Sequence, residues 1–570
     1  MTLTRTAVLL LIASLGFGQL TPEQKVADFM QLAGLYAKRY GPYEWKREAV
    51  NFDLYDVGPW LERVRNSKSD LEFYDVCIDY VAALKDTHDT FSLTSSFSVF
   101  LGFTVDIFDG RLLIDSISRS QLPARDYPFQ VGDELVSMNG RPAMQLMEEE
   151  FLRYSTSRAN PSAQRRRAAQ YLTARSQSLI PRAHEVGETA EVVIRNAAGE
   201  ERSYTIRWDK AGLALTNAGP VPSPKDGRGA VGENSLMPLP QGEPAYMRPL
   251  LEMSYAGVPE RPGDGVLGVG SLTPVFDAPA GFQIRLGVRP TDDFLTGTYR
   301  VGGRTIGFIR IPRMSPNNSV GQALSQLETE IAFFQQNTDG LVIDVMRNPG
   351  GLIPYGHELA RRFIPAPFEG VGFELRASAG YVASFAFNLE NAKRFGAPEH
   401  IVRTWEALLH DVYETFKQNR GRTGALPLGH DSVFFEPATD AAGRNIAYTK
   451  PLIVLIDEFS CSTADLFAAV MQDAGRGPLV GTRTAGCGGT NTNFTATTYS
   501  EGNAGMTLGL MVRPKAIATA EFPTTRYIEN VGVRPDIELD YMTRDNLMQR
   551  GRPFLDAVTQ VILDRIAAAQ

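Results

Sequence analysis

Cysteine is scarce in this sequence: a chain of 570 residues contains three, Cys77, Cys461 and Cys487. Three thiols cannot form a disulfide scaffold, so hydrophobic cores must hold the fold together. Hydrophobic residues make up 43% and charged residues 21% of the chain, a globular composition that excludes a disordered or fibrous protein. One core does not suffice at this length, and we expect about three domains.

An excess of basic residues is also lacking. The formal net charge is −8, and no long block of Lys and Arg occurs. A nucleic-acid-binding protein needs a basic surface, so we exclude nucleic acid as a partner. The run Arg165–Arg167 is short and stands in a polar, helical stretch, which is typical of a solvated helix face.

Residues spaced for metal or phosphate binding are missing as well. The six histidines form no His-x-x-x-His pair and the cysteines no Cys-x-x-Cys pair, which are spacings expected of a zinc site. The glycines of Gly486–Gly489 lack the lysine and the following helix of a phosphate-binding loop. We therefore expect no metal and no cofactor.

Long hydrophobic runs are absent, and one short run stands at the N-terminus. Arg5 precedes the apolar stretch Ala7–Leu15, and the small residues Gly16 and Gly18 follow. A membrane-spanning helix needs about 20 apolar residues, so this run is too short to span a bilayer and fits a signal peptide. We expect cleavage after Gly18 and a periplasmic or extracellular protein without stable membrane insertion.

The hydrophobic pattern changes several times along the chain. Helical spacing follows the signal peptide, short β runs come next, and strands alternate with helices in the C-terminal half. Such alternation predicts an α/β fold with mainly parallel strands. The expected segments are a signal peptide (1–18), an N-terminal helical domain (19–94), a β domain with a helical insert (95–210), a Gly/Pro-rich linker with irregular strands (211–300), an α/β domain (301–545, with an insertion at 365–448) and a C-terminal helix (546–570).

Two stretches of the β domain resemble a PDZ domain. Leu101-Gly102-Phe103 is similar to the loop that holds the terminal carboxylate of a peptide, and Gly132–Gly140 is similar to the family's Gly-Asp-x-Leu-x-x-x-Asn-Gly strand and turn. The resemblance implies that Leu101, Gly102 and Phe103 bind extended or C-terminal segments of a polypeptide through backbone N–H groups and a strand edge. A small β-barrel of purely structural use is the alternative.

A serine stands at a strand–turn–helix junction in the C-terminal half. The β-rich run Pro451–Ile456 is followed by a polar turn that contains Ser460 and Ser462, and Thr463 begins a helix. A serine oxygen at this position lies at the positive end of the helix dipole, near free backbone N–H groups. Serine is also a common N-cap residue, so this stretch alone does not distinguish a nucleophile from a cap.

A glycine pair follows another predicted strand. Gly340–Val345 is apolar and β-rich, and Gly350 and Gly351 come shortly after it. Glycines after a strand let backbone amides approach a ligand, and ligands of open α/β sheets bind at the C-terminal ends of the strands. Two parallel strands that end in a glycine pair and in Ser462 therefore predict hydrogen-bond donors and a nucleophile in one crevice.

The motifs around these residues resemble the tail-specific, or C-terminal processing, serine peptidases. Asp344–Gly351 is similar to the family's Asp-x-Arg-x-Asn-Pro-Gly-Gly signature, and Ser460–Asp465 is similar to its Ser-Ala-Ser-Ala-Ser-Glu nucleophile segment. The resemblance implies a ClpP/crotonase-like α/β catalytic domain, joined to the PDZ-like β domain and the N-terminal helical segment. It also implies that Ser462 attacks peptide bonds of protein or peptide substrates and forms an acyl-enzyme. The oxyanion would be bound by backbone N–H groups of Gly350 or Gly351 and of Thr463.

One departure from the family concerns the general base. The bacterial peptidases have a lysine in a Phe-Gly-Lys-Gly stretch, where this sequence has Cys487. The related tricorn core proteases pair their serine with a histidine, and Leu84–His88 resembles the stretch that carries it, while Ile528–Asp536 resembles the stretch that carries their glutamate. The resemblance therefore implies His88 as general base and Glu529 as its orienting partner, roles that suit an imidazole and a carboxylate.

Each of these assignments has an alternative. His88 can be a histidine held at the end of a helix by the helix dipole, and Glu529 can be a surface carboxylate, with Glu521 as its nearest competitor. The retinoid-binding proteins of the eye resemble the same family and serve as carriers, so a non-catalytic carrier is the main alternative to a peptidase. An acyl-CoA enzyme of the crotonase fold is a third possibility, which the export signal disfavours.

The missing lysine also leads to a hypothesis about the cysteines. If Cys487 occupies the position of that lysine, it lies near Ser462 and near the adjacent Cys461. In an oxidising compartment the two can form a disulfide that braces the active-site loop. The directions of the two side chains decide the matter, and the sequence does not give them.

Overall fold

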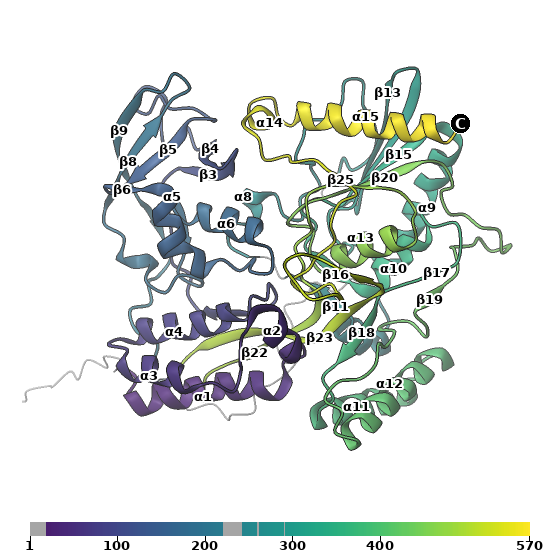
Figure 1. Ribbon diagram of the computed structural model, residues 1–570, viewed down its shortest axis with the longest axis horizontal. Coiled ribbons are helices and arrows are strands. Elements are labelled where there is room, and N and C mark those ends of the chain that lie inside the picture. Colours follow the sequence, from purple (N-terminus) through teal and green to yellow (C-terminus); the bar gives the residue numbers. More distant parts are fainter. Residues whose placement is uncertain (1–18, 221–241, 259–260, 290) are drawn as a thin grey trace, which may run out of the picture.

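The computed structural model describes residues 19–220, 242–258, 261–289 and 291–570. The predicted signal peptide, residues 1–18, lies outside the described residues. Within them, no helix has both the length and the hydrophobicity needed to span a membrane. Figure 1 shows an α/β region on the right, an N-terminal helical region at the lower left and a smaller β domain above it.

Four helices make up the N-terminal region, as predicted for a helical segment. Thr21 forms a capping box with Gln24 at the start of the first helix, and Ser69 caps the fourth, because these side chains satisfy otherwise free N–H groups. A buried core that includes Phe29, Tyr36 and Tyr80 holds the helices together. The helices are α1 (Pro22–Arg39), α2 (Tyr43–Val50), α3 (Gly58–Asn66) and α4 (Asp70–Ala83).

The β domain contains a six-stranded antiparallel sheet of order β3-β4-β5-β8-β9, with β6 paired to β5. The strands are β3 (Phe103–Phe108), β4 (Arg111–Ile117), β5 (Glu134–Met138), β6 (Arg141–Pro142), β8 (Thr189–Arg195) and β9 (Glu201–Arg207). The predicted helical insert includes α5 (Ala143–Leu146) and α6 (Pro161–Gln170). Helix α6 packs against the edge strand β3, where buried Arg166 donates hydrogen bonds to Asp106. Helix α6 therefore lies beside β3, the end strand of this sheet.

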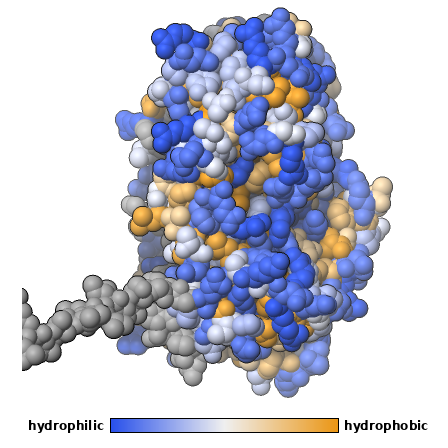
Figure 2. All heavy atoms as spheres, turned by 90° about the vertical axis from the view of Figure 1, so that its left-hand side faces the viewer, coloured by the Kyte–Doolittle hydropathy of each residue, from blue (hydrophilic) through white to orange (hydrophobic). Residues whose placement is uncertain are grey.

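Figure 2 shows the side of the molecule that carries the β domain and the N-terminal helices. Hydrophilic residues cover most of this face, and hydrophobic residues are interspersed among them. The apolar side chains of both regions instead gather in one buried core, which continues from the helices into the sheet. The two regions therefore pack as one body beside the α/β region.

The C-terminal half has the predicted α/β fold. Its sheet has the order β12-β13-β14-β15-β20-β21-β25, in which the strands from β14 onward run parallel. Helices α9, α10 and α13 pack on one face and α15 on the other, which gives three layers around two cores (Figure 1). The strands are β12 (Gln283–Leu286), β13 (Leu295–Val301), β14 (Arg304–Arg310), β15 (Gly340–Asp344), β20 (Leu452–Ile456), β21 (Leu479–Gly481) and β25 (Ile537–Glu538). The helices are α9 (Val320–Asn337), α10 (Ile353–Arg361), α13 (Thr463–Asp473) and α15 (Arg552–Ala568).

The sheet begins earlier than the sequence suggests. The α/β domain was expected from residue 301, but β12 starts at Gln283 and β13 at Leu295, and both pair antiparallel at the sheet edge. Both strands start in the segment 211–300, where the sequence predicted irregular strands within a linker, and tertiary pairing makes them part of the α/β sheet. The insertion at 365–448 contains the expected helix as α12 (Glu399–Lys417), packed against α11 (Ala379–Arg394).

A second sheet connects the N-terminal helices to the α/β region. Its long strand β23 (Gly502–Ile517) pairs with β1 (Thr90–Leu93), which directly follows the turn after α4. The same strand pairs with β18 (Gly372–Leu375), β22 (Gly489–Thr495) and β24 (Thr525–Tyr527). Figure 1 shows β22 and β23 running from the α/β region along the N-terminal helices. This pairing fixes the turn between α4 and β1 against the end of β20.

Candidate active site

Ser462 occupies a strained turn between β20 and α13. Its backbone has φ +63°, a conformation that is rare for a residue with a side chain and that is found mainly where function requires it. Its N–H group donates to the Asp465 carboxylate at 2.5 Å, and the N–H groups of Gly486 and Cys487 donate to the same carboxylate. Burial raises the pKa of Asp465 to about 6, and these hydrogen bonds act against the rise. Asp465 thus holds the turn at Ser462 and the loop at Gly486 and Cys487 together.

His88 and Ser462 meet although 374 positions separate them in the sequence. The Nε2 atom of His88 lies 3.0 Å from Oγ of Ser462, and both residues are buried, with 3% and 0% exposed. The backbone N–H of His88 donates to Asp86 Oδ1 at 2.9 Å, which fixes the turn that presents the imidazole. Burial lowers the pKa of His88 to about 4 against the opposing effect of Asp86. The imidazole is therefore neutral at physiological pH and able to accept a proton.

Two carboxylates lie beside the imidazole, on the side away from Ser462. Asp86 Oδ1 is 4.0 Å from Nδ1 of His88, and one carboxylate oxygen of Glu529 lies within 4.8 Å of the same cluster. Nδ1 itself has no hydrogen-bond partner among the described residues. Glu529 is thus close to His88, as the orienting role requires, but its direct contacts are with Lys46 and with the N–H of Gly488. It is completely buried, which excludes the alternative of a surface carboxylate.

The hypothesis of a disulfide between Cys461 and Cys487 is confirmed. The two Cα atoms are 5.5 Å apart, and the bond links the residue before Ser462 to the loop before β22. Both cysteines are buried, and Cys77 is a free, buried thiol. The position at which related peptidases carry a lysine is therefore filled by a covalent brace.

The three residues expected to bind the oxyanion differ in their hydrogen-bond contacts. Gly350 packs against Ser462, since a Cβ added there would lie 2.8 Å from Cβ of Ser462, but its N–H group already donates to the Asn348 side chain at 2.9 Å. Gly351 belongs to β16 (Gly350–Leu352), and its carbonyl accepts a hydrogen bond from the hydroxyl of Thr463. Thr463 is the first residue of α13, where backbone N–H groups point toward the helix start. The geometry thus favours Thr463 as oxyanion donor and does not favour Gly350.

The expected peptide-binding loop of the β domain is closed. Leu101 and Phe103 are 0% exposed, and the N–H of Leu101 donates to the carbonyl of Thr173 at 2.9 Å. Gly102 has φ +84°, a backbone conformation that favours glycine. Its carbonyl accepts a hydrogen bond from the N–H of Ser118. The N–H of Leu101 and the carbonyl of Gly102 are thus already in hydrogen bonds within the chain, and α6 packs against the neighbouring strand β3. These contacts weigh against Leu101 as a donor, and the assignment of the three residues to peptide binding stays a prediction.

A short strand lies beside Ser462, in the segment where the sequence predicted irregular strands. β11 (Tyr255–Gly257) pairs antiparallel with β16, next to Ser462, and Val258 packs against the disulfide. Arg261 then donates to the carbonyl of Thr87, one residue before His88. β11 thus lies beside the Gly350 turn, close to Ser462, which is itself 0% exposed.

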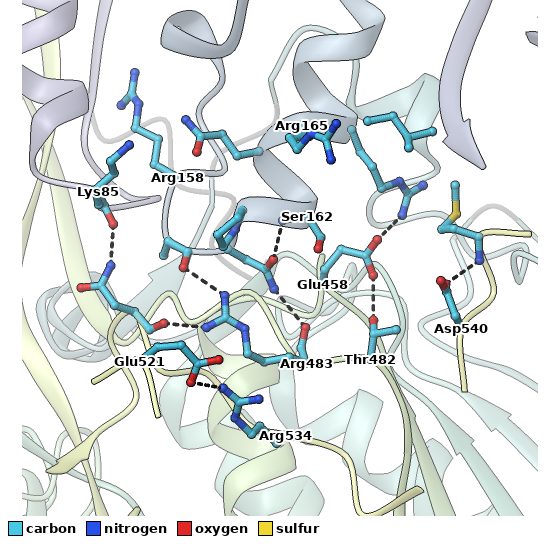
Figure 3. A pocket seen from close by; sticks show the side chains of 18 of the residues that line it. Lys85, Arg158, Ser162, Arg165, Glu458, Thr482, Arg483, Glu521, Arg534 and Asp540 are labelled. Carbon is cyan, nitrogen blue, oxygen red and sulfur yellow. Dashed lines mark hydrogen bonds and ion pairs between the residues drawn. The ribbon is translucent and has the colours of Figure 1, made fainter. Parts of the chain in front are cut away.

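A cavity of about 760 Å³ lies between α6 and the α/β region, behind the turns that carry His88 and Glu529. Figure 3 shows Arg483 reaching across it, where it donates to the carbonyls of Ala159 and Asn530. Lys85 and Asn530, the neighbours of Asp86 and Glu529, belong to its wall. The cavity thus lies where the β domain meets the α/β region, and Arg483 forms hydrogen bonds to both of its sides.

Two clusters of the described residues could be considered for a metal ion. Asp86, His88 and Glu529 form one, but the Lys46 ammonium already contacts Glu529 and lies 3.9 Å from Asp86. The other contains Cys461, Asp465 and Cys487, whose sulfur atoms are joined and so cannot act as thiolates. Neither cluster is suited to a cation.

Lys46, Asp86 and Asp465 are the site residues that sequence reasoning missed. Asp86 could have been identified from the sequence as a neighbour of the imidazole, because it stands two residues before His88. Asp465 could have been identified as well, since it occupies the glutamate position of the family's nucleophile segment. Lys46 could not, because its partner Glu529 follows 483 positions later.

The chain is similar to known proteins over most of its length. Residues 305–539 match the family model "Peptidase family S41", and residues 97–214 match a PDZ domain. An uncharacterized protein of Chlamydia muridarum is 24% identical over 591 residues, which cover 95% of this chain and 93% of the relative. A carboxyl-terminal-processing protease of Synechocystis is 26% identical over 236 residues, which cover 41% of this chain and 38% of the relative. The structure of mature CPAF complexed with lactacystin has a TM-score of 0.72 at 21% identity and covers 96% of this chain and 99% of that one, which shows a shared fold.

Proposed function

We propose that this chain, a serine peptidase with a catalytic domain of family S41, hydrolyses peptide bonds of protein substrates through an acyl-enzyme on Ser462. The observation that carries the proposal is the 3.0 Å contact between Nε2 of His88 and Oγ of Ser462. A serine hydroxyl is a weak nucleophile until an adjacent base accepts its proton, and this contact supplies the base. The same contact weighs against a carrier, which needs no base beside a serine.

The reaction begins when Ser462 Oγ attacks the substrate carbonyl carbon and His88 Nε2 takes the hydroxyl proton. The negative charges of Asp86 and Glu529 stabilise the resulting imidazolium, and the N–H of Thr463 at the start of α13 donates to the oxyanion. The imidazolium then donates its proton to the leaving amine, which leaves an ester between Ser462 and the acyl part of the substrate. Water, deprotonated by His88, hydrolyses this ester and restores the serine.

We also propose that the protein works outside the cytoplasm, in the periplasm or the extracellular space. The predicted signal peptide supports this location. The disulfide between Cys461 and Cys487 supports it as well, because disulfides form and persist in oxidising compartments. Free-thiol titration of protein isolated from the two compartments tests the point: one free thiol is expected in exported protein, and three in the protein retained inside.

Hydrolysis of a fluorescently labelled, unfolded protein tests the function. We expect Ser462→Ala and His88→Ala to lower the rate by at least about 10³-fold, because residues of such a unit each remove nearly the whole effect. The control is His400→Ala, which removes an exposed histidine at the start of α12 and leaves the rate unchanged. Hydrolysis that persists in Ser462→Ala would refute the proposed nucleophile.

A further inference from the structure

Lys46 has no part in the steps above, although its side chain is completely buried next to them. It lies on α2, and its ammonium group donates to Glu529 Oε1, to Asn530 Oδ1 at 2.7 Å and to the carbonyl of Lys85 at 3.4 Å. An ammonium group has three N–H donors, and these acceptors use all three. A buried charge with every donor assigned to a fixed acceptor has a defined position and orientation.

The position of Lys46 places it between the two carboxylates that face His88. Its Nζ atom contacts Glu529 and lies 3.9 Å from Asp86 Oδ2. Two buried carboxylates this close repel each other, and without a cation one of them takes up a proton. Lys46 therefore offsets one negative charge and leaves the cluster with a net charge of about −1, the sign that stabilises an imidazolium.

Glu529 is the carboxylate whose ionisation depends most on this cation. Burial and the neighbouring Asp86 raise its pKa above the ordinary value, whereas Lys46 and the hydrogen bond from Gly488 act against that rise. Its second oxygen accepts the N–H of Gly488 at 2.8 Å, so both oxygens face donors and neither has an acceptor for a carboxyl proton. The hydrogen bonds therefore favour the ionised form as long as Lys46 is present.

Other titratable or charged groups also act on this cluster. Tyr40 donates to Asp86 at 2.9 Å, and Asp89 is buried one residue after His88, with a pKa raised by burial. Arg158 and Arg261 are two further buried cations whose charges act on Asp86 or His88, and Lys85 is the residue next to Asp86. Among the cations of the described residues, Lys46 is the one that forms an ion pair with Glu529, through Oε1.

We propose that Lys46 is a positioning residue of the peptidase reaction, which keeps the Glu529 carboxylate ionised and aimed toward His88. It touches neither the substrate nor Ser462, and it acts through Glu529. The inference rests on the proposed function, because it requires that His88 carry a proton during the reaction.

The test is the pH dependence of kcat/KM for peptide hydrolysis by Lys46→Met, which removes the charge at similar volume. We expect a fall of about 10–100-fold near neutral pH, where Glu529 becomes protonated, and a recovery of at least about tenfold at alkaline pH, where it ionises. Lys46→Met combined with Glu529→Gln should show the same low rate near neutral pH without the alkaline recovery. That pair of results identifies Glu529 as the group that Lys46 keeps charged.

Lys25→Met is the matched control. Lys25 is a buried lysine of α1 whose ammonium lies 3.8 Å from Asp70, outside the active site. It should lower the midpoint of thermal unfolding and leave the pH profile unchanged. If Lys46→Met does not fold, Lys46→Gln carries the same test, because its amide can still donate to Glu529 without a charge.

Two outcomes would overturn the inference. One is a rate that falls by the same factor at every pH in Lys46→Met, which indicates a purely structural role. The other is a profile identical to that of the wild type. An inactive wild-type protein would instead overturn the proposed function, and this inference with it.

Discussion

One added methyl group at Gly350 tests the packing of the active site. Gly350 has φ +86°, a left-handed conformation that costs a residue with a side chain roughly 1–2 kcal/mol. A Cβ there would lie 2.7 Å from the carbonyl oxygens of Ala256 and Cys461 and 2.8 Å from Cβ of Ser462. These atoms belong to the backbone or to a short side chain and cannot rotate away, and such overpacking costs about 1–3 kcal/mol. We expect Gly350→Ala to lower the free energy of unfolding by about 2–5 kcal/mol.

Gly303→Ala separates the two contributions. Gly303 has φ +75° but no atom within 4 Å of an added Cβ, so this variant should lose the conformational part alone, roughly 1–2 kcal/mol. Urea denaturation gives both free energies. Hydrolysis should be unchanged in Gly303→Ala and reduced up to about 100-fold in Gly350→Ala, because a shift of about 1 Å between Ser462 and His88 is enough for such a loss. Equal destabilisation in both variants, with equal hydrolysis rates, would refute the packing argument.

Three further predictions concern stability. Burial lowers the pKa of His88 to about 4, so the unfolded chain binds the proton more readily than the folded protein does. The free energy of unfolding should therefore fall by roughly 3 kcal/mol as the pH falls from about 6.5 to about 4. His88→Gln should lack this part of the pH dependence of unfolding. Replacing Cys461 and Cys487 together by alanine opens a loop of sequence separation 26 and should cost about 3–4 kcal/mol in urea denaturation; an unchanged midpoint would contradict the brace. Arg166→Met leaves the buried carboxylates of Asp106 and Glu458 without their ion-pair partner and should lower the free energy of unfolding by about 3–5 kcal/mol, measured by thermal unfolding. Arg125→Met removes an exposed ion pair and should leave the unfolding midpoint unchanged.

The sequence predicted the parts of this protein that depend on local pattern. The alternation of strands and helices after residue 301 gave the α/β fold, and the strand–turn–helix junction around Ser462 gave the nucleophile turn. The family resemblance then singled out His88, which local pattern alone could not distinguish from a histidine at a helix end. The structure places it against Ser462 because β1 pairs with β23.

The parts that could not be predicted depend on contacts between distant segments. β11 lies in a segment rich in Gly and Pro and becomes a strand because β16 pairs with it. Lys46 is one of many lysines in a helical, charged stretch, and its burial follows from α2 packing against the Glu529 turn. The loop at Leu101 has the sequence of a peptide-binding loop, and no local signal reports that α6 packs against β3 beside it.

The central claim is that His88 activates Ser462, and covalent labelling tests it most directly. A fluorophosphonate reacts with a serine whose proton an adjacent base removes, and tandem mass spectrometry locates the adduct. The account predicts one adduct, on Ser462, in the wild-type protein, and none in Ser462→Ala or His88→Ala over the same time. Labelling of Ser462 at an undiminished rate in His88→Ala, or an adduct on another serine, would contradict it.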